Sequence, residues 1–245
     1  MKEIMLVCAT RMSREAFKKS APLSNSIKKL RNSAPKVTSK ITYQNRKGLG
    51  TIYNRYLKAR HADKILVFVH DDVRIEDLFV VEKLNEALKT FDVVGVAGNK
   101  EPDHNYPSWF DQRRPLSGFV AHVTGKPSAI KPETVFVSSY GPTPDECGPL
   151  DGLFIAVNTE SILSRDVKFD EQFEFHFYDL DFSRTCLRKD LHLGTGRSGL
   201  FTKAVAHSIQ FNGRKQRNCI EINGIWSLPP VSDLTVLVIR ILSLQ

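Results

Sequence analysis

The stretch of sequence that decides the fold is KILVFVHDDVRI, residues 64–75. Its apolar run, residues 65–69, carries no polar residue on either face, which is typical of a strand covered on both sides in a mainly parallel sheet. His70, Asp71 and Asp72 follow at once. They therefore lie at the carboxyl end of the strand, where open α/β sheets bind their ligands. The stretch predicts a buried strand that ends in a polar site.

Similar apolar runs at residues 4–9, 37–43 and 93–97 alternate with stretches of helical character. Helices are expected at 13–30, interrupted by Pro22, at 49–59 and at 75–90; in the last, apolar residues recur at helical spacing. The later sequence predicts a hairpin of 118–124 with 134–138, a strand at 153–157 and a helix through 182–189. This alternation predicts an α/β, Rossmann-like fold with a mainly parallel central sheet and helices on both faces.

The length of 245 residues suits one sizeable α/β core. The N-terminus lacks the long apolar stretch and small-residue cleavage site of a signal peptide, and the four cysteines have no zinc-type spacing. We therefore expect a cytoplasmic protein with reduced thiols. The apolar tail at residues 231–244 is too short to span a bilayer. Docking on the core or dimerisation is one interpretation of that tail, and contact with a membrane interface is the other.

The net charge of +8 is unevenly distributed. Between Arg11 and Arg60 there are 14 Lys or Arg residues against one acid, Glu15, so that 14 − 1 gives +13. A basic lobe of this kind suits phosphates, an anionic membrane surface or nucleic acid. Ordinary solvated helix faces would also produce it. Few aromatic residues are interleaved with these cations, which disfavours a nucleic-acid-binding module.

The chemistry predicted from this sequence depends on paired carboxylates. Asp71 and Asp72 would repel each other unless a cation or hydrogen bonds hold them. Their hard oxygen atoms suit Mg²⁺ or Mn²⁺, which can bridge to a diphosphate. Capping of a helix that begins near Ile75 would explain one of the two aspartates, but not the pair together with His70. A metal-dependent phosphoesterase could use the same triplet, although a second carboxylate–histidine cluster is not evident in the sequence.

A second acidic pair, Asp179 and Asp181, stands at the start of an expected amphipathic helix. A carboxylate held near a sugar acceptor can take the proton of the attacking hydroxyl. An ordinary acidic first turn, favoured by the helix dipole, is the alternative interpretation. His207 follows a strand-like apolar run and is either a ligand or a hydrogen-bonded core residue.

The ordered series of HDD at 70–72, DG at 151–152, FDEQF at 169–173 with YDLD at 178–181, and a late His207 resembles GT-A glycosyltransferases of the family-2 type. It resembles most the short subgroup typified by a streptomycin-biosynthesis protein. Asn45 and GLGTIYN at 48–54 resemble the family element that precedes the metal motif. The resemblance implies one domain at 1–228, with a nucleotide-binding half at 1–98 and an acceptor-binding and catalytic half at 99–228. The apolar tail then covers 229–245.

The resemblance also implies roles for individual residues, with two departures from the family pattern. His70 stands where the family has its first aspartate, and Tyr178 replaces the usual glutamate before the base. The implied catalytic base is Asp179. The remaining assignments are nucleotide contacts by Thr10, Asn45, Gly48, His70 and Asp71, metal binding by Asp72 and His207, and acceptor binding by Trp109, Asp151 and Gly152.

The function that the resemblance implies is a metal-dependent, inverting glycosyltransferase. Its donor would be a nucleoside-diphosphate sugar, first of all a UDP-sugar, with Mn²⁺ or Mg²⁺ as cofactor. The acceptor would be a hydroxyl of a glycan, a lipid-linked glycan or a small molecule, as in polysaccharide biosynthesis. Peripheral contact with the inner face of an anionic membrane is a further expectation, whereas specific nucleic-acid binding is not expected.

Overall fold

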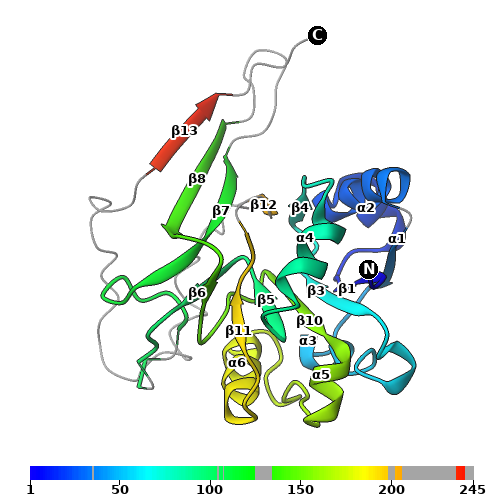
Figure 1. Ribbon diagram of the computed structural model, residues 1–245. Coiled ribbons are helices and arrows are strands. Elements are labelled where there is room, and N and C mark those ends of the chain that lie inside the picture. Colours follow the sequence, from blue (N-terminus) through cyan, green and yellow to red (C-terminus); the bar gives the residue numbers. More distant parts are fainter. Residues whose placement is uncertain are drawn as a thin grey trace, which may run out of the picture.

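The computed structural model describes residues 1–34, 36–103, 105–106, 108–124, 134–197, 202–205 and 236–240. A seven-stranded sheet lies at its centre (Figure 1). Five of its strands run in the same direction; the two exceptions are antiparallel to their neighbours. The mainly parallel sheet is therefore confirmed. The strand order is β2 (Val37–Thr42), β1 (Ile4–Ala9), β3 (Ile65–Val69), the antiparallel β10 (Phe154–Asn158), β5 (Val93–Gly95), β11 (Leu193–Thr195) and the antiparallel β9 (Asp145–Glu146).

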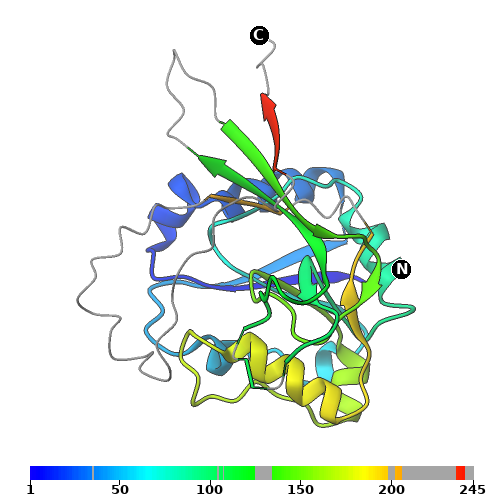
Figure 2. The same cartoon turned by 90° about the vertical axis from the view of Figure 1, so that its left-hand side faces the viewer.

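Helices cover both faces of this sheet, as the views in Figures 1 and 2 show. Strand β1 shows why, because its alternate residues enter two different cores. Ile4, Leu6 and Cys8 pack with one set of helices, whereas Met5 and Val7 pack with the other. The first set comprises α1 (Arg14–Ser20), α2 (Pro22–Ser33) and α4 (Val80–Ala87); the second comprises α3 (Leu49–Tyr53), α5 (Thr159–Ser164) and α6 (Tyr178–Arg188).

Local sequence signals explain the break between the first two helices. The Ser13 hydroxyl caps α1 by accepting a hydrogen bond from the Ala16 amide at 3.1 Å. Pro22 then occupies the start of α2, where the amide that proline lacks would have had no helical partner. The interruption expected at Pro22 is confirmed.

A second sheet joins segments far apart in the sequence. Its core is the antiparallel hairpin of β7 (Leu116–Thr124) and β8 (Thr134–Gly141), which confirms the expected hairpin and extends it. Strand β13 (Val236–Arg240), from the apolar tail, pairs antiparallel with β8. On the other side lie β12 (Thr202–Val205) and β4 (Val73–Ile75), and β6 (Ala97–Asn99) also pairs with β7.

The helix expected at 75–90 begins later, at Val80, because Val73–Ile75 form strand β4 instead. The partner of β4 is β12, more than a hundred residues further along the chain, so local periodicity could not reveal the pairing. The Ser26 hydroxyl on α2 also accepts a hydrogen bond from the Ile75 amide at 2.8 Å. No helix begins near Ile75, and helix capping is thereby removed as an explanation for Asp71 and Asp72.

Helix α3 is shorter than expected. The helix expected at 49–59 ends at Tyr53, and a short 3₁₀ helix, η1 (Ala59–His61), follows it. Within the part of the chain that the structure describes, no helix is both long enough and apolar enough to cross a membrane.

Candidate active site

The triplet His70, Asp71 and Asp72 lies immediately after β3, as expected, and three elements hold it there. The His70 amide donates to the Leu153 carbonyl at 3.2 Å, just before β10. The Asp71 carbonyl accepts from the Leu23 amide of α2 at 3.3 Å. The Thr10 hydroxyl, at the end of β1, donates to Oδ2 of Asp71 at 2.5 Å. The triplet therefore has a fixed position at the carboxyl edge of the sheet.

Asp179 lies in the first turn of α6, where main-chain amides orient its carboxylate. Oδ2 accepts from the Gly152 amide at 2.8 Å, and Oδ1 accepts from the Leu180 amide at 2.9 Å. Burial raises the pKa of the Asp179 carboxyl above its ordinary value, while these two amides act in the opposite direction. A carboxylate with a raised pKa and a fixed orientation is suited to act as a general base.

Tyr178 connects Asp179 to His70 through one hydrogen-bonded chain. Its hydroxyl donates to the Gly152 carbonyl at 2.7 Å, and Nε2 of His70 lies 2.8 Å from the same hydroxyl oxygen. Because the hydroxyl has one proton to donate, Nε2 of His70 must be the donor in the second bond. Burial lowers the pKa of His70, so the imidazole is neutral and the lone pair lies on Nδ1.

Asp151 and Trp109 also meet at this site. The Asp151 carboxylate accepts a hydrogen bond from the Leu153 amide at 2.7 Å and another from Trp109. Burial raises the pKa of Asp151 to about 6. The Trp109 ring has edge contacts with Phe110 and Tyr140, at centroid distances of 5.5 and 5.2 Å. These contacts make Trp109 a support for Asp151; its role as a sugar platform stays a prediction.

The structure thus brings most of the predicted residues together. His70 interacts electrostatically with Asp72 and Asp179, and Asp151 interacts with both of these aspartates. His207 lies outside the described residues. Among the residues that are described, no group of three or more His, Cys, Asp or Glu side chains is arranged to hold a metal ion. The carboxylates of the triplet still fit Mg²⁺ or Mn²⁺, because such ions take one or two protein carboxylates and complete their shell with phosphate oxygens and water.

An open cleft of about 660 Å³ is lined by Arg11, Gln44, Asn45 and Arg46. The Asn45 amide donates to the Thr10 carbonyl at 2.8 Å, so the cleft and Asp71 meet at Thr10. Two guanidinium groups suit the phosphates of a nucleotide. Of these lining residues, sequence reasoning had identified Asn45 alone. The sequence signal that could have identified the other three is their position directly after strands β1 and β2.

Gly48 has a structural role that its motif did not indicate. A β-carbon at this position would lie 3.0 Å from Cα of Glu174. The neighbouring Leu49 amide donates to the Glu174 carbonyl at 2.8 Å, which holds the two backbones together. Glycine is therefore favoured by the close approach of the two backbones. A nucleotide contact of Gly48 stays a prediction.

The FDEQF motif, 169–173, connects the segment before α6 to α3. The Asn54 side chain donates to the Phe169 carbonyl and accepts from the Phe169 amide, both at 2.9 Å. Glu171 accepts from the Thr51 hydroxyl at 2.9 Å and from Asn54 at 3.0 Å. These bonds fix the segment that leads into α6, and the motif therefore positions Asp179 from a distance.

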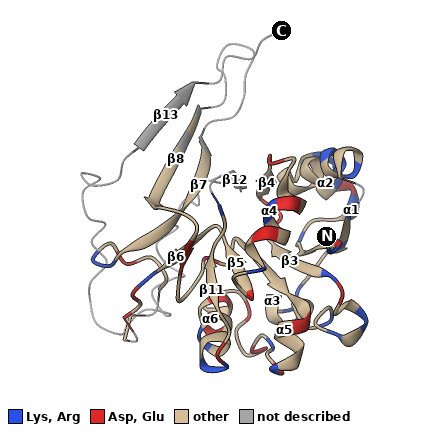
Figure 3. Cartoon of the chain, in the orientation of Figure 1, with Lys and Arg blue, Asp and Glu red and all other residues tan. Residues whose placement is uncertain are grey.

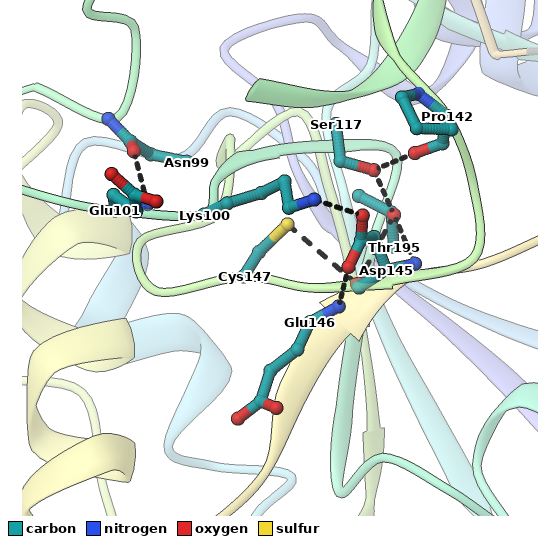
Figure 4. A network of polar contacts seen from close by, with 9 residues as sticks. All are labelled: Asn99, Lys100, Glu101, Ser117, Pro142, Asp145, Glu146, Cys147 and Thr195. Atoms are coloured by element: carbon teal, nitrogen blue, oxygen red, sulfur yellow. Dashed lines mark hydrogen bonds and ion pairs between the residues drawn. The ribbon is translucent and has the colours of Figure 1, made fainter. Parts of the chain in front are cut away.

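A polar network that is separate from the cluster of Asp72, Asp151 and Asp179 joins the two sheets (Figure 4). Nζ of Lys100 lies 2.5 Å from Oδ2 of Asp145, and the hydroxyls of Ser117 and Thr195 are 2.6 Å apart. The strand segments continue to the active site, because the Asp151 amide donates to the Ala97 carbonyl at 2.9 Å. The network therefore holds the chain that delivers Asp151 and Gly152.

A carboxylate cluster therefore lies at the carboxyl edge of a mainly parallel sheet, where open α/β sheets bind their ligands. The sequence matches the model of the glycosyltransferase-like family over residues 8–213, and the chain belongs to that family. The protein is thus a glycosyltransferase.

Comparison with solved structures found low-identity matches. The crystal structure of A197 from STIV has 10% identity and a TM-score of 0.45, over 80% of this chain and 82% of that one. The structure of S. aureus TarS 1–349 in complex with UDP has 13% identity and a TM-score of 0.42. That match covers 83% of this chain but 60% of the TarS chain. No curated protein matches the sequence.

Proposed function

We propose that this glycosyltransferase moves a sugar, with inversion, from a nucleoside-diphosphate sugar to an acceptor hydroxyl, with Mn²⁺ or Mg²⁺ as cofactor. A UDP-sugar is the first donor to test. The observation that carries the proposal is the Asp179 carboxylate, which the Gly152 and Leu180 amides hold beside His70. The basic cleft adjoins the same cluster at Thr10 and Asp71.

On the donor side, the residues of the cleft bind the nucleotide. Arg11 and Arg46 offer charge-assisted hydrogen bonds to the diphosphate, and the amides of Gln44 and Asn45 offer polar contacts to the base or ribose. Asp72, assisted by Asp71, would hold the metal ion. When bound, that ion supplies positive charge to the leaving diphosphate.

On the acceptor side, Asp179 takes the proton of the attacking hydroxyl. Its raised pKa makes it a stronger base than an exposed aspartate, and its two amide contacts fix the direction in which it accepts. Direct attack by the acceptor in a single displacement inverts the anomeric centre. Asp151, beside Asp179, is placed to accept hydrogen bonds from other acceptor hydroxyls.

The acceptor in this proposal is a glycan that includes lipid-linked forms, and the basic lobe faces the anionic inner surface of a membrane. All 14 Lys and Arg residues between Arg11 and Arg60 are exposed. Lys29, which pairs with Glu76 at 2.9 Å, is the one member of this set in an ion pair among the described residues. Figure 3 shows these cations along α1 and α2. Exposed cations without acidic partners attract anionic lipid.

A thermal-shift panel of nucleoside diphosphates and their sugars, with and without Mn²⁺, tests the proposal. We expect one nucleotide and its sugars to raise the melting temperature, and Mn²⁺ to be required, because a ligand that binds only the folded state stabilises it. A melting temperature that depends neither on the nucleotide added nor on Mn²⁺ would contradict the proposal. Hydrolysis of phosphodiesters without any sugar donor would favour the phosphoesterase instead.

A further inference from the structure

Two of the large apolar side chains that remain exposed lie directly before the catalytic base. Phe175 is 54% exposed and Phe177 is 40% exposed, in the sequence FEFHF at residues 173–177. Most large apolar side chains of the described residues are buried in the two cores. Exposed apolar groups clustered beside a polar site are characteristic of ligand-binding surfaces.

The ring of Phe175 is fixed in position although it is exposed. It stacks on the His70 ring with a centroid distance of 5.9 Å and an interplanar angle of 28°. His176 contacts it nearly perpendicularly, at 5.2 Å and 86°. One face of Phe175 is therefore directed at His70, and the exposed fraction of the side chain leaves ring surface open to solvent. Through His70 and Tyr178, this ring is continuous with the Asp179 cluster.

The backbone on each side holds the aromatic segment at the rim of the site. On one side, the Glu174 carbonyl accepts from the Leu49 amide at 2.8 Å. On the other, Phe177 has φ of 64°, in the left-handed region, and its carbonyl accepts from the Asp181 amide at 2.9 Å. Residues other than glycine rarely adopt this conformation, and such strained conformations are concentrated at functional sites. Backbone hydrogen bonds therefore anchor this segment on both sides of the exposed rings.

We propose that Phe175 is the platform on which a pyranose ring of the acceptor stacks, which makes the acceptor a glycan or glycoside. This inference rests on the proposed function and specifies its acceptor. The C–H bonds on one face of a pyranose carry partial positive charge and suit the negative face of an aromatic ring. The hydroxyls at the edge of the same sugar suit the carboxylates of Asp151 and Asp179.

Position and chemistry assign this platform to the acceptor. The donor cleft joins the cluster through Thr10 and Asp71, whereas Phe175 joins it through His70 and lies on the segment that leads into the base. A purely apolar ligand would place hydrocarbon against the carboxylates of Asp151 and Asp179 and leave them without hydrogen bonds. A sugar satisfies both the aromatic ring and the carboxylates.

Ligand-observed NMR tests the platform with a panel of methyl pyranosides of common hexoses and N-acetylhexosamines, in the presence of UDP and Mn²⁺. We expect Phe175→Ala to weaken pyranoside binding by at least about fivefold, and Phe175→Trp to retain it, because an aromatic stack contributes at this level. Phe79→Ala is the matched control, since Phe79 is 66% exposed but lies at the start of α4. The control should bind as the wild type does.

Equal binding by Phe175→Ala and the wild type would overturn the inference, as would an equal loss in Phe79→Ala or no binding of any pyranoside by the wild type. The thermal-shift panel reports separately on the proposed function. If pyranoside binding depends on Phe175 while no nucleotide stabilises the protein, the platform stands and the donor assignment fails. If a nucleotide with Mn²⁺ stabilises the protein while pyranosides bind independently of Phe175, the platform fails alone.

Discussion

Asp179 occupies the space that a side chain at Gly152 would need: its Oδ2 lies 2.8 Å from the position of a β-carbon there. The Tyr178 hydroxyl crowds the same position from a second direction. The peptide of Gly152 is also bonded on both sides, because its amide donates to Asp179 and its carbonyl accepts from Tyr178. Glycine at this position therefore holds Asp179, the proposed catalytic base, in place.

We expect Gly152→Ala to reduce transfer strongly and to lower stability by about 1–3 kcal/mol, because the added methyl must displace Asp179 and Tyr178. Transfer assays and thermal denaturation measure the two effects. Gly95→Ala is the control, since the atoms nearest to its β-carbon belong to the Leu150 side chain, at 3.2 Å, and not to Asp179 or Tyr178. It should lose stability without a specific loss of transfer. Near-wild-type transfer by Gly152→Ala would contradict this role.

Asp179→Asn should lose transfer by roughly 10²–10⁴-fold, because the amide cannot accept the proton of the attacking hydroxyl. Donor and metal binding should stay nearly normal in the thermal-shift assay. Asp181→Asn is the matched control, since Asp181 lies in the same helical turn but interacts electrostatically with Arg184 and Arg188. It should mainly lower stability. If Asp181→Asn is inactive and Asp179→Asn is active, the base has been assigned to the wrong residue.

The sequence predicted the central strands β1 and β3 more accurately than the elements that depend on pairing between remote segments. The bounds expected for β1 and β3 agree with those observed, because continuous apolar runs bury both faces of a strand wherever they occur. The positions of the triplet at 70–72 and of the pair Asp179 and Asp181 were predictable because strand ends and the first turns of helices are visible in the sequence, whereas the choice of Asp179 as base comes from the family resemblance and stays a prediction. The family match supports the resemblance without testing its short HDD subgroup.

What the sequence could not predict depends on contacts between remote segments. Strand β4 was not predicted, and its last residue, Ile75, was expected to begin a helix, because the pairing of β4 with β12 leaves no local signal. Arg11 and Arg46 were counted as part of a charged lobe, and only the fold shows that they line the same cleft. Phe175 was not distinguished from neighbouring aromatic residues, because the sequence does not show which of them stay exposed.

Asp72→Ala should abolish the Mn²⁺-dependent part of the stabilisation by nucleoside diphosphate while the fold survives, because a carboxylate of the triplet would hold the metal against the diphosphate. Thermal shift with and without Mn²⁺ measures this part. Asp63→Ala is the control, since Asp63 is exposed at the opposite end of β3. Full metal-dependent stabilisation of Asp72→Ala would show that the metal assignment is wrong.

The basic lobe should bind anionic vesicles through α1 and α2. Substituting Glu for Lys18, Lys19 and Lys28 should weaken flotation of the protein with phosphatidylserine vesicles by at least about tenfold. Each surface cation contributes to attraction by anionic lipid, and it acts within a Debye length. All three side chains are exposed.

The control for this prediction reverses Arg165, Lys168 and Lys189, which are equally exposed but belong to the side of the sheet that carries α5 and α6. Because both triple variants change the net charge by the same amount, a difference between them reports the position of the charge. Binding of the wild type should rise with the fraction of anionic lipid and fall with salt. Membrane contact is removed from the proposed function if the wild type binds neutral and anionic vesicles equally, or if the two triple variants lose binding equally. Either result would show that the lobe does not recognise anionic lipid.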